Sequence, residues 1–147
     1  VAIQLSYHFI KTTLDHIEKQ YPIDLHRSNE NRFVYVKQNI GKSVLIDARS
    51  KEEFIGAVIR GARRGHIPGA INVDFMANIS ENGTIKDEKQ LAELYKIPKD
   101  SPIITYCQGA YRAANSFLAL KKLGFTKIKV YLGSWGEWSN KTELPVE

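Results

Sequence analysis

The single cysteine of the chain, Cys107, opens a segment whose residue types could make it a nucleophile. The segment reads CQGAYR, ends in Arg112, and leads into a helical pattern. A loop curled at a helix N-terminus points backbone N–H groups inward, and with the helix dipole these groups form a cradle for an anion. A cysteine in such a cradle has a stabilised thiolate, which is the nucleophilic form. Gly109 tolerates unusual backbone angles and leaves room for a ligand, and Arg112 adds a fixed positive charge.

The commoner role of a free cysteine is that of a small buried hydrophobic residue. Three observations favour the nucleophile here: Cys107 stands at the end of an apolar run, a glycine follows two residues later, and Arg112 closes the segment. We therefore interpret Cys107 as a catalytic cysteine and the residues after it as an anion-binding loop.

Two apolar runs must position this chemistry. The run PIITY ends immediately before Cys107, and the run SVLI ends immediately before Asp47. Ser50, followed three residues later by Glu53, forms a capping-box pattern, so we expect a helix to begin there. A second helix is expected over 112–124, where it ends in a glycine.

The rest of the chain alternates in the same way. Strands are expected at 71–73, after a Pro-Gly turn, and at 127–133, and a helix capped by Asp87 is expected over 87–97. This alternation predicts an α/β fold in which a central parallel sheet is covered by helices on both faces. Ligands of such open sheets bind beyond the carboxyl ends of the strands, where the cysteine stands. The remaining expectations are a helix over 9–21, an irregular connection over 21–33 and a tight turn or short helix in SWGEWSN.

Composition narrows the class of protein. The 147 residues fit one domain, and 43% hydrophobic with 25% charged residues is typical of a soluble globular protein. A net charge of +5 favours anionic partners without requiring nucleic acid. Since no run of 18 apolar residues occurs, we expect no membrane association by a spanning helix. One cysteine excludes an internal disulfide framework and favours a cytoplasmic location, and the missing initiating methionine leaves a periplasmic one open.

Four segments resemble a known family. LIDARSKEEF, GHIPGAINV, YCQGAYRA and YLGSWGEW occur in the order and spacing seen in rhodanese-type sulfurtransferase domains, from about Lys42 to the end of the chain. GSWGEW and the closing LPVE resemble the C-terminal, catalytic half of tandem two-domain thiosulfate/3-mercaptopyruvate sulfurtransferases. The resemblance implies one rhodanese domain over 1–147, with its core at about 42–147 and an N-terminal helix and connection at 1–41. It leaves open that the domain was excised from a longer tandem chain.

The resemblance also implies a mechanism. Cys107 attacks the sulfane sulfur of a small anionic donor such as thiosulfate, becomes a persulfide, and passes the sulfur to an acceptor such as cyanide, a thiol or a protein thiol. No metal or organic cofactor is required. The loop that binds the anion consists of Gln108, Gly109, Ala110, Tyr111 and Arg112.

Further residues are expected to support this loop. Asp47 matches the family aspartate, which either holds the loop or Arg49 by hydrogen bonds or caps the following turn. Arg49 is expected to form a structural ion pair and His66 to be fixed in its turn by hydrogen bonds. Trp135 and Trp138 are expected to pack at the wall of the site.

The sequence departs from the family at positions that bear on the donor. Thiosulfate-preferring members typically have arginine and lysine after the cysteine, mercaptopyruvate-preferring members have glycine and serine, and this chain has Gln108 and Gly109. Arg112 stands where tandem members often have threonine, and Glu53 stands where several have a substrate-binding arginine. These departures predict weaker capture of a doubly charged donor and leave the natural donor open.

Three alternative functions remain. A dual-specificity-type phosphatase has five residues between its cysteine and arginine, whereas four separate Cys107 from Arg112, which argues against that activity. A non-catalytic regulatory domain would commonly lack the cysteine. A persulfide carrier shares the chemistry and differs in its acceptor. The arginines of RGARRG are expected to form an exposed basic loop, or alternatively a basic lip that attracts small anions; they are Arg60, Arg63 and Arg64.

Overall fold

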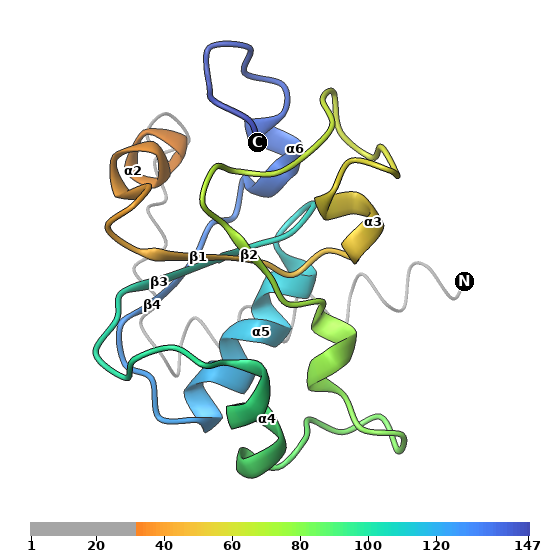
Figure 1. The fold of residues 1–147 in the computed structure, drawn as a ribbon, viewed down its shortest axis with the longest axis vertical. Coiled ribbons are helices and arrows are strands. Elements are labelled where there is room, and N and C mark those ends of the chain that lie inside the picture. The colour runs from red at the N-terminus through yellow and green to blue at the C-terminus, as the bar shows by residue number, and fades with distance from the viewer. Residues whose placement is uncertain (1–31) are drawn as a thin grey trace.

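The computed structural model of the chain describes residues 32–147, so the helix expected over 9–21 lies outside the described residues (Figure 1). All strand pairs in its single sheet are parallel, which confirms the expected fold class. The strands lie in the order β2-β1-β3-β4. Their bounds are β1 Val44–Asp47, β2 Ile71–Asn72, β3 Ile103–Tyr106 and β4 Ile128–Val130.

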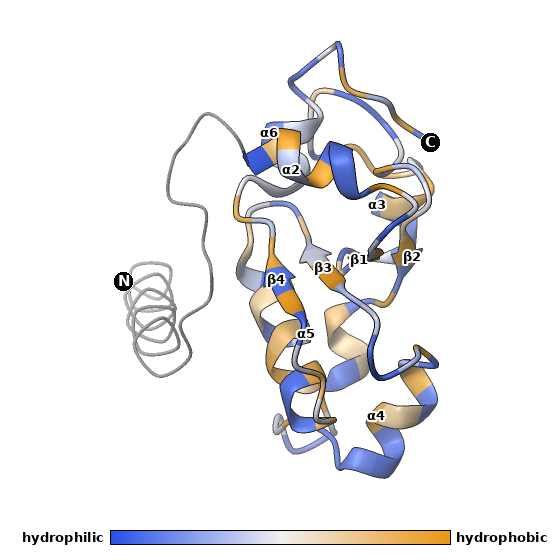
Figure 2. Cartoon of the chain, turned by 90° about the vertical axis from the view of Figure 1, so that its left-hand side faces the viewer, coloured by the Kyte–Doolittle hydropathy of each residue, from blue (hydrophilic) through white to orange (hydrophobic). Residues whose placement is uncertain are grey.

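Helices cover both faces of this sheet. In Figures 1 and 2, α4 and α5 lie on one face and α2 and α6 on the other. The helices are α2 (Arg32–Asn39), α3 (Lys51–Phe54), α4 (Glu88–Leu94), α5 (Tyr111–Lys122) and α6 (Ser134–Trp138), with a 3-10 helix η1 (Phe75–Asn78) between β2 and α4. None of the helices in the described part of the chain is long and apolar enough to cross a membrane.

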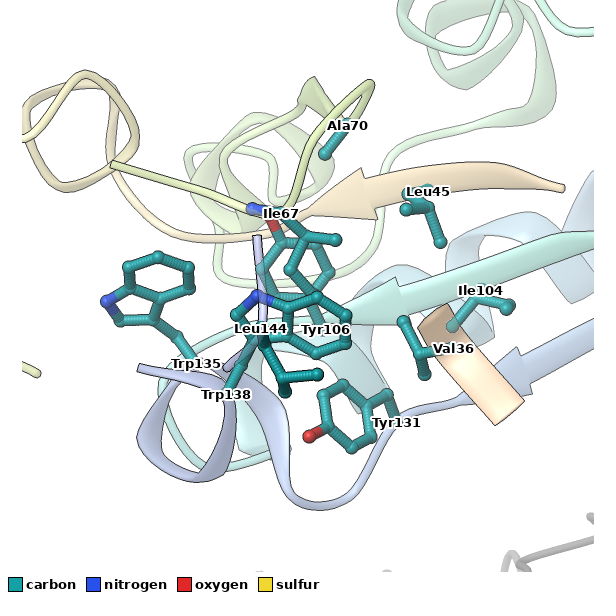
Figure 3. Packing of buried hydrophobic residues seen from close by; sticks show 10 residues of the cluster. All are labelled: Val36, Leu45, Ile67, Ala70, Ile104, Tyr106, Tyr131, Trp135, Trp138 and Leu144. Carbon is teal, nitrogen blue, oxygen red and sulfur yellow. The ribbon is translucent and has the colours of Figure 1, made fainter. Parts of the chain in front are cut away.

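Each face of the sheet packs its own hydrophobic cluster. On the α4 and α5 face, Leu91 and Phe117 pack with residues of β1 and β3. On the opposite face, Trp138 and Tyr131 pack with Val36 of α2, as Figure 3 shows. The sheet is therefore buried on both sides, as expected for parallel strands.

Local sequence explains where most helices begin and end. Ser50 and Glu53 form the complete capping box at the start of α3. Asp87 accepts the N–H of Gln90 at 2.8 Å and caps α4. α5 ends before Gly124, whose φ of +82° is a left-handed conformation that glycine adopts without strain.

Two helices differ from the sequence-based expectations. α2 begins at Arg32, although the pattern indicated an irregular connection as far as Phe33 and no helix after it. Val36 is fully buried and Phe33 and Tyr35 pack against the same hydrophobic cluster, but eight residues are too short a window for a clear helical period. The 3-10 helix η1 was also not expected; it begins where the side chain of Asp74 accepts the N–H of Met76 at 3.0 Å.

The register of the central strands brings the predicted chemistry together. Asp47 of β1 pairs with Tyr106 of β3, and the N–H of Ala48 donates to the carbonyl of Tyr106 at 2.8 Å. Cys107 follows Tyr106 directly, so Asp47 and Cys107 leave the sheet at the same edge.

Candidate active site

Cys107 is the first residue after β3 and is 1% exposed. Its nearest buried neighbours are the small residues Ala48 and Ala113, and Phe75 is packed against them. Above it the crown of the loop is open, because a Cβ atom placed on Gly109 would meet no atom within 4 Å. Cys107 is therefore buried among apolar side chains, while Gly109 of the same loop faces open space.

The hydroxyl of Ser134, in α6, binds two backbone N–H groups of this loop. Its Oγ accepts the N–H of Cys107 at 3.2 Å and the N–H of Ala110 at 3.1 Å, and donates to the carbonyl of Tyr131 at 2.8 Å. All of these hydrogen bonds are buried, so the serine hydroxyl fixes the loop backbone from the other side of the site.

The backbone of α6 adds two further bonds to the loop. Trp135 N–H donates to the carbonyl of Cys107 at 2.8 Å, and Gly136 N–H donates to the carbonyl of Gln108 at 3.0 Å. A Cβ atom on Gly136 would lie 2.9 Å from that same carbonyl oxygen, so the close approach of α6 requires glycine at this position.

Left-handed backbone angles flank the thiol. Ala110 has φ 72° and Ser134 has φ 53°, and these are the non-glycine residues with positive φ in the described chain. The unusual angle expected at Gly109 thus falls on Ala110 instead. Within residues 32–147, the N–H groups of Tyr111 and Arg112 at the start of α5 have no acceptor, which leaves them available to an anion.

Arg112 forms a two-pronged ion pair with Glu53 of α3. Its Nη1 lies 2.6 Å from Oε2 and its Nη2 3.0 Å from Oε1, and the carboxylate is 3% exposed. Burial alone would raise the pKa of Glu53, but the hydrogen bonds and charge of Arg112 outweigh it and hold that pKa below its ordinary value. The pKa of Arg112 is raised mainly by its hydrogen bonds to Glu53, and further by the charges of Glu53 and Cys107.

The other predicted supporting residues occupy the far side of the loop. Asp47 accepts three contacts from the Arg49 side chain, the shortest 2.6 Å, and one from the Arg49 N–H at 2.9 Å. Arg49 also donates to the carbonyl of Gly65 at 2.8 Å and lies over the Trp135 ring at 4.7 Å from its centre. Both charges are fully buried, so this pair joins β1, the following turn and α6.

His66 and Gln108 have partners outside the thiol's immediate surroundings. The ring of His66 stacks on Phe54 with 3.6 Å between centres, and its Nδ1 lies 2.9 Å from the carbonyl of Phe54. Gln108 donates through Nε2 to the carbonyl of Arg60 at 3.1 Å, while its Oε1 is buried without a partner among the described residues. Tyr111 is 46% exposed at the mouth.

The three arginines of RGARRG have different roles. Arg63 donates to the carbonyls of Trp138, Ser139, Lys141 and Leu144 at 2.8 to 3.0 Å, so the expected exposed basic loop is wrong for this residue. Arg60 is 64% exposed and lies 3.8 Å from Glu53 at the mouth of the site. Arg64 makes one longer bond, of 3.3 Å, to Gly56.

Ser134 and Gly136 were not singled out as functional from the sequence. Asn72, whose Nδ2 donates to the carbonyls of Asp47 and Arg49 at 3.0 and 2.8 Å, was not either. The signal for the first two was present in the segment GSWGEW, where Ser134 and Gly136 flank Trp135. Residues 32–147 contain no group of three or more His, Cys, Asp or Glu side chains placed to hold a metal ion.

The described residues thus form an α/β sheet that presents one cysteine in a tight loop between a strand and the N-terminus of a helix. The model of the rhodanese-like domain matches residues 33–141, and the chain belongs to that family. A thiosulfate sulfurtransferase of Pseudomonas aeruginosa is 34% identical over 131 residues, which are 86% of this chain and 48% of the relative. The sulfur carrier protein TtuD of Thermus thermophilus is 38% identical over 123 residues, 76% of this chain and 43% of the relative.

Solved structures agree with this assignment. An EanB variant whose cysteine carries a persulfide, in a tetrahedral intermediate state with ergothioneine, superposes with a TM-score of 0.66 at 26% identity. The match covers 72% of this chain and 28% of that one. The chain thus spans less than half the length of these relatives.

Proposed function

We propose that this domain transfers sulfane sulfur through a persulfide on Cys107. The observation that carries the proposal is the position of the chain's only cysteine, at the carboxyl end of β3 in the loop that leads to Arg112 of α5, in a member of the rhodanese-like family. Curated relatives named thiosulfate sulfurtransferase and a structural neighbour with a persulfide support it.

The reaction proceeds in two displacement steps. The Cys107 thiolate attacks the outer sulfur of thiosulfate, a new S–S bond forms, the donor's S–S bond breaks, and sulfite leaves with the electron pair. A thiolate or cyanide then attacks the outer sulfur of the persulfide, and Cys107 leaves as the thiolate. The free N–H groups at the start of α5 stabilise the negative charge in both steps.

A role as a sulfur carrier is the second candidate. TtuD, named as a sulfur carrier protein, is 38% identical to this chain, and the same Cys107 persulfide would serve. The two functions differ only in whether the acceptor is a small thiophile or a protein thiol. Phosphatase activity is disfavoured, because Arg112 is held by Glu53 at the end of a loop with four intervening residues.

The experiment is an intact-mass measurement after incubation with thiosulfate. We expect the protein to gain the mass of one sulfur atom, to lose it on addition of cyanide, and to release thiocyanate. The Cys107→Ser variant should show no adduct and a turnover lower by about 10³-fold or more. An unmodified wild-type mass with every sulfur donor tried, or a variant as active as the wild type, would contradict the proposal.

A further inference from the structure

The positive charge that closes the Cys107 loop is already compensated inside the protein. Arg112 lies in the first turn of α5, and both terminal nitrogens of its guanidinium face the Glu53 carboxylate, at 2.6 and 3.0 Å. This bidentate pairing occupies one N–H of each terminal nitrogen, and the carboxylate offsets the charge with which arginine would otherwise bind an anionic substrate. The cation that the sequence assigns to anion binding therefore acts as half of an ion pair.

Glu53 is fixed in this position by more than Arg112. Its Oε2 also accepts the backbone N–H of Ser50 at 3.3 Å in the capping box of α3, and Arg60 Nε lies 3.8 Å from its Oε1. A carboxylate that is 3% exposed and held from three directions cannot swing away when a donor arrives. The counter-charge is a permanent part of the site.

The other charged groups around the loop cancel as well. Arg49 and Asp47 form a second buried pair, so the arginines Arg49, Arg60 and Arg112 face the carboxylates Asp47 and Glu53. Three positive and two negative groups leave one net positive charge, and it belongs to Arg60, which is 64% exposed and screened by solvent. The formal charges of these five side chains therefore nearly cancel.

This neutrality discriminates between sulfur donors by their charge. Thiosulfate brings two negative charges to a thiolate, so the transition state carries three, and in a partly buried site this repulsion is strong. An organic persulfide brings at most one. Its reaction is balanced without any redox partner: the Cys107 thiolate attacks the outer sulfur of R–S–SH, a new S–S bond forms, the donor's S–S bond breaks, and R–S⁻ leaves with the electron pair.

We propose that Glu53 is the specificity-determining residue of this site and that, by holding Arg112, it selects organic persulfides over thiosulfate as the sulfur donor. This inference rests on the proposed sulfur transfer through Cys107. It assigns to Glu53 a positioning and charge-compensating role, since its carboxylate acts on the donor through Arg112.

The test uses Glu53→Gln and its neighbour Glu52→Gln. Glutamine can occupy the same place in a capping box, so E53Q keeps the shape of α3 while it removes the charge and one of the two oxygens that accept from Arg112. E52Q makes the same change in net charge at an exposed position of the same helix. The second-order rate of Cys107 persulfidation is measured by intact mass with thiosulfate and with the hydropersulfide of 2-mercaptoethanol.

We expect the wild type to react faster with the hydropersulfide than with thiosulfate. E53Q should raise the thiosulfate rate by about tenfold or more and change the hydropersulfide rate by less than about threefold, and E52Q should change neither by more than about twofold. In the double variant E53Q/R112Q, the ratio of the two rates should return to near the wild-type ratio, because the freed charge has been removed.

Several results would overturn the proposal while leaving sulfur transfer intact. A wild type that prefers thiosulfate refutes the donor class. Equal changes of both rates in E53Q show a structural role, and a double variant that keeps the raised thiosulfate rate shows that the effect bypasses Arg112. A wild type that gains no sulfur from either donor instead refutes the sulfurtransferase function itself, so the two failures are distinguishable.

Discussion

At the scale of single residues, the hydroxyl of Ser134 is the least expected part of the site. A left-handed φ of 53° is unfavourable for serine by about 1–2 kcal/mol, and glycine would avoid that cost. The side chain compensates with three buried hydrogen bonds, two of which hold the N–H groups of Cys107 and Ala110. Strain of this kind persists where the surrounding contacts over-determine the conformation.

Removal of the Ser134 hydroxyl should show whether the geometry of the loop affects kcat without affecting KM. In Ser134→Ala the two loop N–H groups lose their acceptor, and we expect kcat for sulfur transfer to fall by about 10- to 100-fold with KM changed by less than about threefold. Steady-state thiocyanate formation measures both constants.

Ser139 provides the matched control for this variant. It is also a buried serine at the end of α6, and its Oγ accepts the N–H of Ala62 at 3.1 Å, away from the loop. We expect Ser139→Ala and Ser134→Ala to lower the free energy of unfolding by similar amounts, about 1–3 kcal/mol each. Ser139→Ala should nevertheless keep the wild-type kcat. If both variants lose kcat equally, the effect of Ser134 is one of general stability.

The contrast between Cys107 and Ser134 shows what sequence reasoning can reach. Cys107 and Arg112 were identified because their signals lie within one short segment, next to a strand end and a helix start. Ser134 acts through a contact 27 positions away in the chain, which no local pattern reports. The pairing of Arg112 with Glu53 spans 59 positions and was missed for the same reason.

At the scale of elements, Arg63 connects the segment before β2 to the C-terminal part of the chain. Its guanidinium donates to four carbonyls between Trp138 and Leu144, at the end of α6 and in the turn after it. Two of these carbonyls, those of Trp138 and Lys141, also accept a backbone N–H. Gly61 lies close by, since a Cβ atom there would stand 2.5 Å from Ser139 Oγ. This contact keeps α6, and with it Ser134, against the sheet.

Replacement of Arg63 by lysine should loosen that connection. Lysine keeps the charge but has no planar fork, so we expect Arg63→Lys to lower the free energy of unfolding by about 2–4 kcal/mol. Urea denaturation gives the free energy, and hydrogen exchange should show faster exchange at the end of α6.

Arg64→Lys is the control, because Arg64 is exposed and makes one longer hydrogen bond. It should stay within about 0.5 kcal/mol of the wild type. Equal destabilisation by the two lysines would show that the four carbonyl contacts of Arg63 contribute little.

The ends of helices were predictable where the sequence contains a capping residue. Ser50 and Asp87 each accept a backbone N–H as the sequence indicated, and Gly124 follows the end of α5. α2 was missed because its eight residues are too few to show a helical period, and the clustering of arginines before His66 gave no hint that one of them faces inward. Charge patterns report exposure only on average, whereas carbonyl groups at a helix end can draw a guanidinium in.

At the scale of the whole molecule, the strand and helix alternation determined the fold class, because parallel strands need crossover helices and bury both faces. The parallel arrangement of strands also brings oppositely charged residues from distant parts of the chain into an ion pair. Glu53 and Arg112 come from α3 and α5, which follow the neighbouring strands β1 and β3, so their ion pair spans the two crossovers at the carboxyl edge.

Acid should therefore weaken the folded molecule through Glu53. Its pKa is below the ordinary value of 4.5 in the folded state, so the unfolded chain binds the proton first as pH falls. The stabilisation is complete above that ordinary value and is lost as pH falls through the lowered pKa. The free energy of unfolding, measured by urea at intervals between pH 7 and pH 3, should fall less steeply in E53Q than in the wild type. Parallel curves for the two proteins would contradict this.

The bonds from α6 to the loop have a consequence for protein engineering. The peptide groups of Trp135 and Gly136, together with the hydroxyl of Ser134, hydrogen-bond to the loop of Cys107 and hold its backbone from the side of α6. If CQGAYR alone were grafted onto a different strand–helix junction, the cysteine would be transferred without the α6 residues that hold its loop. The smallest portable unit is discontinuous, two short peptides that a host scaffold must hold face to face.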